Sequence, residues 1–235
     1  MDGQQKVNPL KRTEIIENQS DYLIVNKPAG ILSQSGINDG EPNLLSYLQK
    51  WKKQKFHLLS RLDRPVSGLT ILSKTKAFNR HYQSIQESGK VQKTYIALVE
   101  GLIEEEEGTL NQFLCHDKRL RKSIISNEEK ENYDPVSLEF KCLAKLDRYS
   151  IIATKINTGK FHQIRSQLSS IGYPIKGDVK YGARRGNKDR SINLHSYKIS
   201  FKDRSQSFKT YKAQFPKNDN LWNIVSQALN KKIDE

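Results

Sequence analysis

Ser60-Arg-Leu-Asp-Arg-Pro-Val-Ser-Gly68 runs directly into the apolar segment Leu69-Thr-Ile-Leu72. The Pro and Gly are typical of a turn, and the apolar segment predicts a buried strand. Asp63 therefore lies in a loop between Arg61 and Arg64, whose guanidinium groups would favour its ionised form. Such a carboxylate can act as a nucleophile or a base. An ordinary salt bridge that closes the loop is the alternative, and the local sequence alone favours it.

The elements around this stretch follow from the spacing of apolar residues. Residues 21–25 predict a strand that stops at the turn Asn26-Lys-Pro-Ala-Gly30. Residues 42–55 and 75–87 predict helices, because their apolar side chains recur at helical spacing. Strands are predicted at 94–99, at 136–143 with 149–156, and at 193–201 with 207–215. Thr158 is the predicted cap of a helix that ends near Ile171, and 221–229 predict a last helix.

These elements indicate an α+β fold with a mixed, mostly antiparallel sheet and flanking helices, because neighbouring strands do not alternate strictly with helices. The polar residues 1–20 predict a loosely ordered segment, and the charged residues 118–133 predict a mobile loop. Residues 21–235 are expected to form a single domain, and a division into two lobes stays open.

The composition excludes several classes of protein. Hydrophobic residues make up 35% of the 235 residues, and no stretch approaches the roughly 18 to 20 apolar residues of a membrane span. The polar start, Met1 to Arg12, lacks the apolar core of a secretory signal. Cys115 and Cys142 provide neither a disulfide framework nor zinc spacing. We therefore expect a cytoplasmic protein.

The chain is strongly basic, and the charge is unevenly distributed. It has 40 Lys and Arg against 26 Asp and Glu, a formal net charge of +14. Residues 155–212 contain 14 basic and 3 acidic residues, whereas residues 101–150 contain 8 and 11. A local excess of this kind favours a surface that follows the phosphates of a polyanion. A merely solvated basic face is the alternative.

A second polar segment is Asn157-Thr-Gly-Lys-Phe-His-Gln-Ile-Arg165. On a helix, His162 and Arg165 would share a face. Arg165 could then pair with a carboxylate or reach a phosphate. The alternative is that His162 and Gln163 only pack and form hydrogen bonds at a helix start. The segment lacks the glycine and hydroxyl residues of a Walker loop.

Tyr95 begins a strand that is expected to be buried, where a tyrosine is usually part of the core. It could also stack on a base extruded from RNA. Five scattered histidines without paired carboxylates make a metal site unfavourable, and the chain has neither a dinucleotide fingerprint nor a serine nucleophile elbow.

Taken together, the segments resemble the RluA-type pseudouridine synthases over about residues 20–215. The motifs occur in the family's order: Asn26-Lys-Pro-Ala-Gly30, Arg61-Leu-Asp63 with Ser67-Gly68, Lys93-Thr-Tyr95 with Val99-Glu-Gly101, Thr158-Gly through His162-Gln-Ile-Arg165, Gly172-Tyr-Pro-Ile-Lys-Gly-Asp178 with Tyr181-Gly182, and Leu194-His195. Two positions depart from the family's usual pattern. This chain has Ser60 where the family usually has His, and Val66 where it often has Thr. The resemblance is to a short form without the S4 RNA-binding module.

The resemblance implies a catalytic domain whose active site lies in a basic cleft across the sheet, without a cofactor or a metal. It implies that Asp63 is the essential aspartate, that Tyr95 packs against the target base and that Arg165 pairs with Asp63. Arg61 resembles the arginine that displaces the flipped nucleotide. Arg64, Lys160 and His162 are further candidates for RNA contacts or base flipping.

The resemblance implies an enzyme that isomerises uridine to pseudouridine in ribosomal large-subunit RNA or tRNA. It is expected to be a monomer. The carboxylate could attack C1′ of the sugar, attack C6 of the base or remove a sugar proton, and the sequence leaves all three routes open. The first alternative is a non-catalytic RNA-binding or ribosome-associated protein with the same fold. A glycosidase is less favoured, because no second carboxylate stands in a matching motif.

Overall fold

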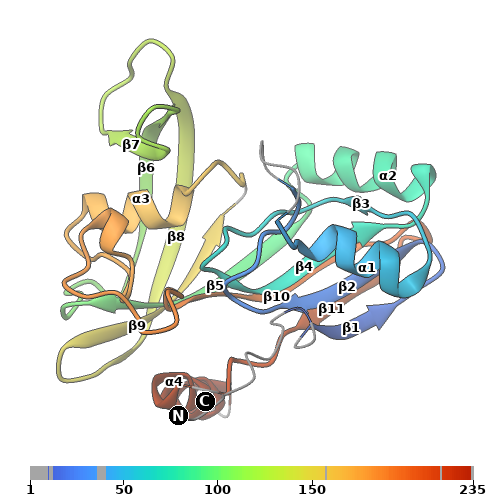
Figure 1. The fold of residues 1–235 in the computed structure, drawn as a ribbon. Coiled ribbons are helices and arrows are strands. Elements are labelled where there is room, and N and C mark those ends of the chain that lie inside the picture. Colours follow the sequence, from blue (N-terminus) through green and yellow to red (C-terminus); the bar gives the residue numbers. More distant parts are fainter. Residues whose placement is uncertain (1–9, 11–12, 36–40, 157, 218, 234–235) are drawn as a thin grey trace.

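The computed structural model describes residue 10 and residues 13–35, 41–156, 158–217 and 219–233 (Figure 1). The described residues form one 11-stranded sheet with four α-helices. The strands are β1 (Glu14–Asn18), β2 (Tyr22–Lys27), β3 (His57–Leu58), β4 (Ser67–Ser73), β5 (Gln92–Glu100), β6 (Glu107–Asp117), β7 (Lys122–Ser126), β8 (Asp134–Lys145), β9 (Tyr149–Ile156), β10 (Leu194–Lys202) and β11 (Phe208–Lys212). The helices are α1 (Leu44–Lys52), α2 (Lys76–Glu87), α3 (Gln163–Ser170) and α4 (Asn220–Ile233), with a short 3₁₀ helix at Val179–Tyr181.

The sheet has the strand order β1-β2-β4-β10-β5-β9-β8-β6-β7, with β3 and β11 paired beside this path. Its paired strands are antiparallel except β4 and β10, which run parallel. This parallel pair joins Ser67 and Gly68 to His195 and Ser196. The predicted α+β fold with a mixed, mostly antiparallel sheet is confirmed.

Helices cover both faces of the sheet, because the strands alternate their side chains between two apolar layers. In β2, Tyr22 and Ile24 pack in the cluster with α2, whereas Leu23 and Val25 pack in the cluster with α1. In β5, Tyr95 belongs to the cluster that contains residues of α3, and Ile96 belongs to the cluster of α4. Figure 1 shows α3 and α4 on opposite sides of the sheet.

The predicted helices α1 and α2 both begin at a side-chain cap. The side chain of Asn43 accepts a hydrogen bond from the backbone of Ser46, and Thr75 accepts one from Phe78. Both side chains satisfy amide groups that have no partner in the first helical turn. The predicted strand pairs in the second half of the chain are also confirmed, as β8 with β9 and β10 with β11.

Three local predictions are wrong. Within the segment 1–20, Glu14–Asn18 forms β1 and pairs with β2; residues 1–9, 11 and 12 lie outside the described part. Within 118–133, Lys122–Ser126 forms β7 and pairs with β6. In both places a short apolar pair, Ile15-Ile16 or Ile124-Ile125, lies in a strand that pairs with its neighbour in the sheet, and this tertiary contact overrides the polar composition.

The third error concerns α3, which begins at Gln163 and not after Thr158. His162 adopts a left-handed conformation with φ 53°, which does not continue a helix. The Thr158 hydroxyl donates to the side chain of Gln163 at 2.8 Å and so closes the preceding loop. Asn157 lies outside the described residues.

No helix in the described part of the chain combines the length and the apolar character needed to cross a membrane.

Candidate active site

The loop that carries Asp63 is held on both sides by the turn that follows β2. The hydroxyl of Ser33 donates to the carbonyl of Leu62 at 2.8 Å and accepts from the Leu62 amide at 3.0 Å. The amide of Gly30 donates to the carbonyl of Arg64 at 2.7 Å. Both neighbours of Asp63 are therefore fixed, and Asp63 projects from a rigid backbone.

The side chain of Arg165 joins two carboxylates. Its Nη1 lies 2.9 Å from Oδ2 of Asp63, although 102 positions separate the two residues, so the predicted ion pair is confirmed. Its Nε and Nη2 donate to the two oxygens of Asp178 at 2.6 and 2.8 Å. Such two-point binding fixes the plane of a guanidinium group. Asp178 therefore aims Arg165 at Asp63.

His162 approaches the same oxygen from a second direction. Its Nε2 lies 3.5 Å from Oδ2 of Asp63, and its Nδ1 lies 2.9 Å from the hydroxyl of Tyr181. Burial, followed by the charge of Arg165, lowers the pKa of His162 to about 3. The contact with Asp63 is therefore between a carboxylate and a neutral ring.

Tyr181 contacts the other nitrogen of that ring. Its hydroxyl accepts a hydrogen bond from the amide of Ser123 at 2.7 Å and can donate its own hydrogen to Nδ1 of His162. In that arrangement the proton of the neutral ring is on Nε2, facing Asp63. The ring of Tyr181 also lies 5.0 Å from the guanidinium carbon of Arg165. Tyr181 thus supports both groups that contact Asp63.

Tyr95 and Asp63 line one small cavity of about 60 Å³, open to solvent, together with Arg61, Lys160, His162 and Arg165. Tyr95 is 8% exposed. Burial raises the pKa of Tyr95 to about 12, assisted by the charge of Asp63 and opposed by a hydrogen bond with Ser196. Its ring is therefore a neutral, mostly apolar wall beside the carboxylate.

The remaining predicted residues have other partners. Arg64 donates from Nε to the carbonyl of Gly30 at 3.1 Å and pairs with Glu41 at 3.3 Å. The expectation that both neighbouring arginines stabilise the Asp63 carboxylate is therefore wrong for Arg64, because the loop turns its side chain toward Glu41. Lys160 pairs with Asp134 at 2.8 Å. Arg61 is exposed at the cavity.

Sequence reasoning assigned no role to Asp178, Tyr181 or Lys27. All three stand inside motifs quoted for the resemblance, which was the available signal. Lys27 is fully buried, and its Nζ donates to the carbonyls of Pro28 and Ile31 at 3.0 Å each. Burial lowers the pKa of Lys27 to about 7 against the attraction of Asp63. It holds together the turn that fixes the Asp63 loop.

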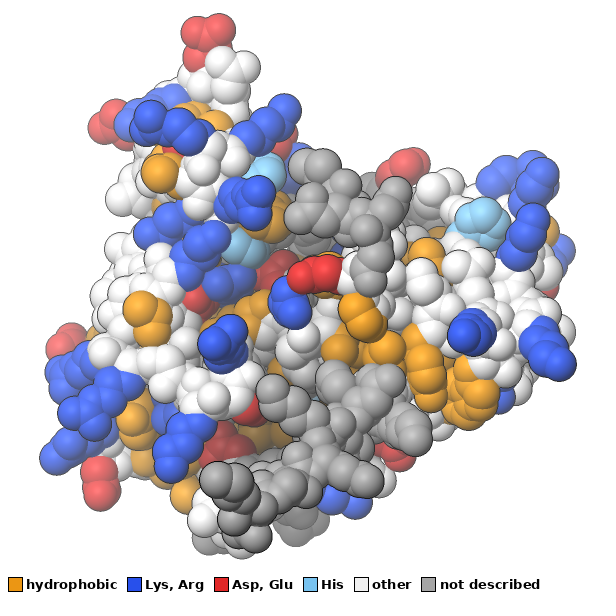
Figure 2. Space-filling model, viewed as in Figure 1, with side chains coloured by type: hydrophobic (Ala, Val, Ile, Leu, Met, Phe, Trp, Pro, Cys, Tyr) orange, Lys and Arg blue, Asp and Glu red, His pale blue; other side chains and the backbone are white. Residues whose placement is uncertain are grey.

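Further basic side chains lie beside Tyr181 and on the loop that follows it. Lys122 and Lys180 flank Tyr181, with the Lys122 ammonium 4.9 Å from the ring centre. Arg184 and Arg185 follow on the exposed loop. Figure 2 shows Lys and Arg side chains over the part of the molecule that contains α3, β6 and β7, and others over the part that contains α2. In the described residues, no three His, Cys, Asp or Glu side chains form a group that could hold a metal ion.

Comparisons with known proteins show the fold and the family of this chain. The solved structure named Human RNA Pseudouridylate Synthase Domain Containing 1 has the same fold, with a TM-score of 0.77 and 22% identity over 96% of this chain and 98% of that one.

Among sequence relatives, Ribosomal large subunit pseudouridine synthase D of Borreliella burgdorferi is 33% identical over 214 residues. The match covers 86% of this chain, which spans only 65% of that relative's length. The tRNA pseudouridine synthase C of Vibrio vulnificus is 31% identical over 188 residues, which are 74% of this chain and 76% of the relative.

The family model described as RNA pseudouridylate synthase matches residues 21–170. These matches agree with the resemblance seen in the motifs, and the chain belongs to the RNA pseudouridylate synthase family.

Proposed function

We propose that this protein isomerises uridine to pseudouridine in structured RNA, with Asp63 as the essential carboxylate. The observation that carries the proposal is the contact between Asp63 and Arg165 inside a cavity that Tyr95 also lines. An incidental loop salt bridge would not need a buried arginine clamped by Asp178. Relatives that act on ribosomal large-subunit RNA and on tRNA support both RNAs as substrates.

The contacts of Asp63 assign different tasks to its two oxygens. Oδ2 receives both Arg165 and His162, which fix the orientation of the carboxylate. Within the described residues, no hydrogen bond or ion pair engages Oδ1. Oδ1 is therefore the oxygen available to the substrate, whether it attacks C1′, attacks C6 or removes a sugar proton.

The other residues of the cavity would receive the target nucleotide. Uridine must leave its stack to reach Asp63, at a cost of a few kcal/mol. The neutral ring of Tyr95 offers an apolar surface for the extruded base. Arg61, exposed at the entrance, can occupy the space that the base vacates. Lys160 and the basic loop with Arg184 and Arg185 would bind phosphates.

RNA is thus the proposed partner, and the bacterial relatives support action in the cytoplasm. A monomeric state and the absence of a cofactor stay predictions from the resemblance.

Pseudouridine mapping of total RNA tests the proposal. Cells that lack the protein should lose pseudouridine at one or a few positions in ribosomal RNA or tRNA. Wild-type protein should restore these positions, and an Asp63→Asn variant should not. Unchanged pseudouridine at every position would contradict the enzymatic function and favour a non-catalytic RNA-binding protein.

A further inference from the structure

The C-terminal end of α1 carries an exposed aromatic pair among lysines. Trp51 is 49% exposed, and its ring stacks on the ring of Tyr47 with the two centres 5.8 Å apart. Tyr47 in turn packs against the apolar cluster beneath α1 and so supports the Trp51 ring. The ammonium of Lys52 lies 4.3 Å from the centre of the Trp51 ring. This surface is named the α1 platform and consists of Tyr47, Trp51, Lys52, Lys53, Lys55 and Lys74.

The α1 platform carries positive charge that the described structure does not neutralise. Lys52, Lys53 and Lys55 are exposed, and none of them forms an ion pair with a described carboxylate. The pairing of β3 with the end of β4 brings Lys74 beside these residues. Burial, followed by the charge of Lys52, lowers the pKa of Lys74. The platform is therefore a surface that attracts an anion.

Helix stability accounts for only part of this arrangement. Lys50 and Lys52 lie in the last turn of α1, where positive charge interacts favourably with the helix dipole. Lys53 and Lys55 lie beyond that turn, and Lys53 has a left-handed conformation, with φ 49°, that glycine adopts more readily. An exposed aromatic ring among cations is typical of surfaces that stack bases and bind phosphates.

The other end of α1 begins at the turn that holds the catalytic loop. The amide of Leu45 donates to the carbonyl of Ser33 at 3.1 Å, and the hydroxyl of Ser33 binds Leu62 next to Asp63. From this turn the nine residues of α1 extend about 14 Å. A single strand that places its uridine at Asp63 therefore needs only a few nucleotides to reach the α1 platform.

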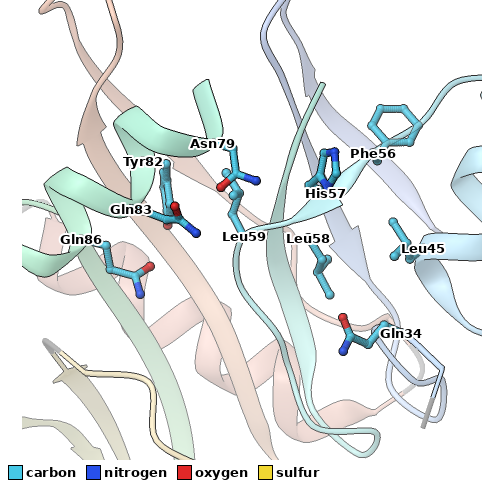
Figure 3. Close-up of a pocket in the computed structure, with 10 residues that line it drawn as sticks. All are labelled: Gln34, Leu45, Phe56, His57, Leu58, Leu59, Asn79, Tyr82, Gln83 and Gln86. Carbon is cyan, nitrogen blue, oxygen red and sulfur yellow. The ribbon is translucent and has the colours of Figure 1, made fainter. Parts of the chain in front are cut away.

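A cavity of about 410 Å³ between α1, β3 and α2 adjoins the α1 platform (Figure 3). Phe56 and His57 line it and directly follow Lys55 in the chain. The described residues of its wall include four amide side chains and no Asp or Glu. Glu41, just before α1, pairs with Arg64. A phosphate chain beside this cavity therefore meets no uncompensated carboxylate among the described wall residues.

We propose that the α1 platform binds an unpaired nucleotide of the RNA substrate that lies outside the active-site cavity. Its base stacks on Trp51, and the neighbouring phosphates bind Lys52, Lys53 and Lys55. This inference rests on the proposed function, because the RNA that presents its uridine to Asp63 supplies the nucleotide.

Binding of the base displaces the Lys52 ammonium from the Trp51 ring. An exposed contact between a cation and a ring is weaker than the stacking of a base on an aromatic ring, so the exchange is favourable. The displaced ammonium is then free to bind a phosphate. An acidic protein would use the lysines alone and would leave the exposed ring without a partner, so RNA fits the platform better.

Tryptophan fluorescence tests the stacking without catalysis. The chain has two tryptophans, and Trp222 is only 4% exposed, so a base on the α1 platform changes the emission of Trp51. Single-stranded oligoadenylate, which contains no uridine, should quench this emission. Polyphosphate of the same charge should bind without quenching. Trp51→Phe, which leaves Trp222 as the one tryptophan, should lose the response. Equal quenching by both polyanions, or quenching by neither, would overturn the proposal.

Affinity for oligoadenylate measures the contribution of the ring. Trp51→Ala should weaken binding about tenfold, and Trp51→Phe should retain it within about threefold. The matched control, Phe208→Ala, removes an aromatic side chain that is 63% exposed on β11 and should bind normally. Equal losses from Trp51→Ala and Phe208→Ala, or normal binding by folded Trp51→Ala, would contradict stacking on the platform.

A variant of two exposed lysines tests the phosphate contacts without disturbing the fold. Lys53→Gln with Lys55→Gln should reduce the salt dependence of oligoadenylate binding by about 2 on the logarithmic scale. An unchanged slope would overturn the assignment of phosphates to the α1 platform, whether or not Trp51→Ala folds.

A kinetic measurement connects the α1 platform to the substrate. With the RNA found by pseudouridine mapping, Trp51→Ala should raise KM about tenfold and leave kcat unchanged, because it weakens binding away from the reacting atoms. An unchanged KM would show that the platform does not bind the RNA substrate. The fluorescence and affinity readouts do not depend on pseudouridine formation, so they distinguish failure of this inference from failure of the proposed function.

Discussion

At the scale of single residues, Arg165 is the side chain on which the site depends. It is buried, with 5% of its side chain exposed, and it contacts Asp63 and the equally buried Asp178. A buried charge is tolerated only while its partners remain, because removal of one partner leaves charge without compensation. The same residue therefore affects both stability and the orientation of Asp63.

Asp178→Asn should lower the free energy of unfolding by about 3 kcal/mol, because Arg165 loses a buried ionic partner. Urea denaturation measures this change. The control is Glu106→Gln in the exposed pair with Lys145, which should cost less than about 1 kcal/mol. Equal, small effects of the two substitutions would contradict the role given to Asp178.

Two buried histidines predict how stability varies with pH. Burial lowers the pKa values of His162 and His195 to about 3, from 6.5 for an unperturbed histidine. Between these values the unfolded chain binds protons that the folded protein does not. The free energy of unfolding should therefore fall as pH is lowered from about 6.5 toward 3.

His162→Asn removes one of the groups that take up a proton only in the unfolded chain. The slope of the free energy of unfolding against pH should therefore decrease by about 1.4 kcal/mol per pH unit. Urea denaturation at several pH values measures it. An unchanged slope in the variant would show that His162 is not held neutral by the fold.

At the scale of elements, the close pairing of β4 with β10 positions the catalytic loop. Gly68 has φ +113°, and a Cβ there would overlap the backbone carbonyl of Ser196. Only glycine allows the two strands to meet at this point. Because Ser67 and Gly68 directly follow the Asp63 loop, this pairing fixes the end of the loop in the interior of the sheet.

Gly68→Ala should therefore destabilise the protein by about 2 kcal/mol or more, because backbone strain adds to a steric overlap. Gly172→Ala is the matched control: φ is +86° there, but nothing lies within 4 Å of the added carbon. It should cost about 1 kcal/mol. Thermal unfolding compares the two, and similar losses would contradict a close approach at Gly68.

The sequence predicted the helices and two strand pairs from apolar periodicity, and the pairing of Asp63 with Arg165 from the ordered motifs. It did not predict β1, β3, β6 or β7, whose residues are stabilised by neighbouring strands. It also missed the partners of Arg64 and the roles of Asp178 and Tyr181. These contacts depend on how distant loops meet, for which local spacing carries no signal.

At the scale of the whole molecule, the uneven charge predicts how RNA binds. The affinity should fall linearly with the logarithm of the salt concentration, because bound phosphates release counterions. Replacing Arg184 and Arg185 by Gln should reduce this slope by about 2 when filter binding is measured over a salt series. The control replaces Lys141 and Lys145 by Gln, which removes the same amount of positive charge as the two arginine substitutions. These lysines pair with Glu107 and Glu106. The same loss of slope from both pairs would contradict a localised RNA surface.

The central claim is that Asp63 performs the chemistry. The most direct measurement is single-turnover conversion of the mapped uridine by purified wild-type protein, Asp63→Asn and the control Asp134→Asn, whose exposed carboxylate pairs only with Lys160 among the described contacts. Asp63→Asn should bind the RNA normally and convert uridine at least about 10³-fold more slowly. Asp134→Asn should stay within about tenfold of wild type. Conversion by Asp63→Asn at the rate of the control would contradict the assignment of the active site.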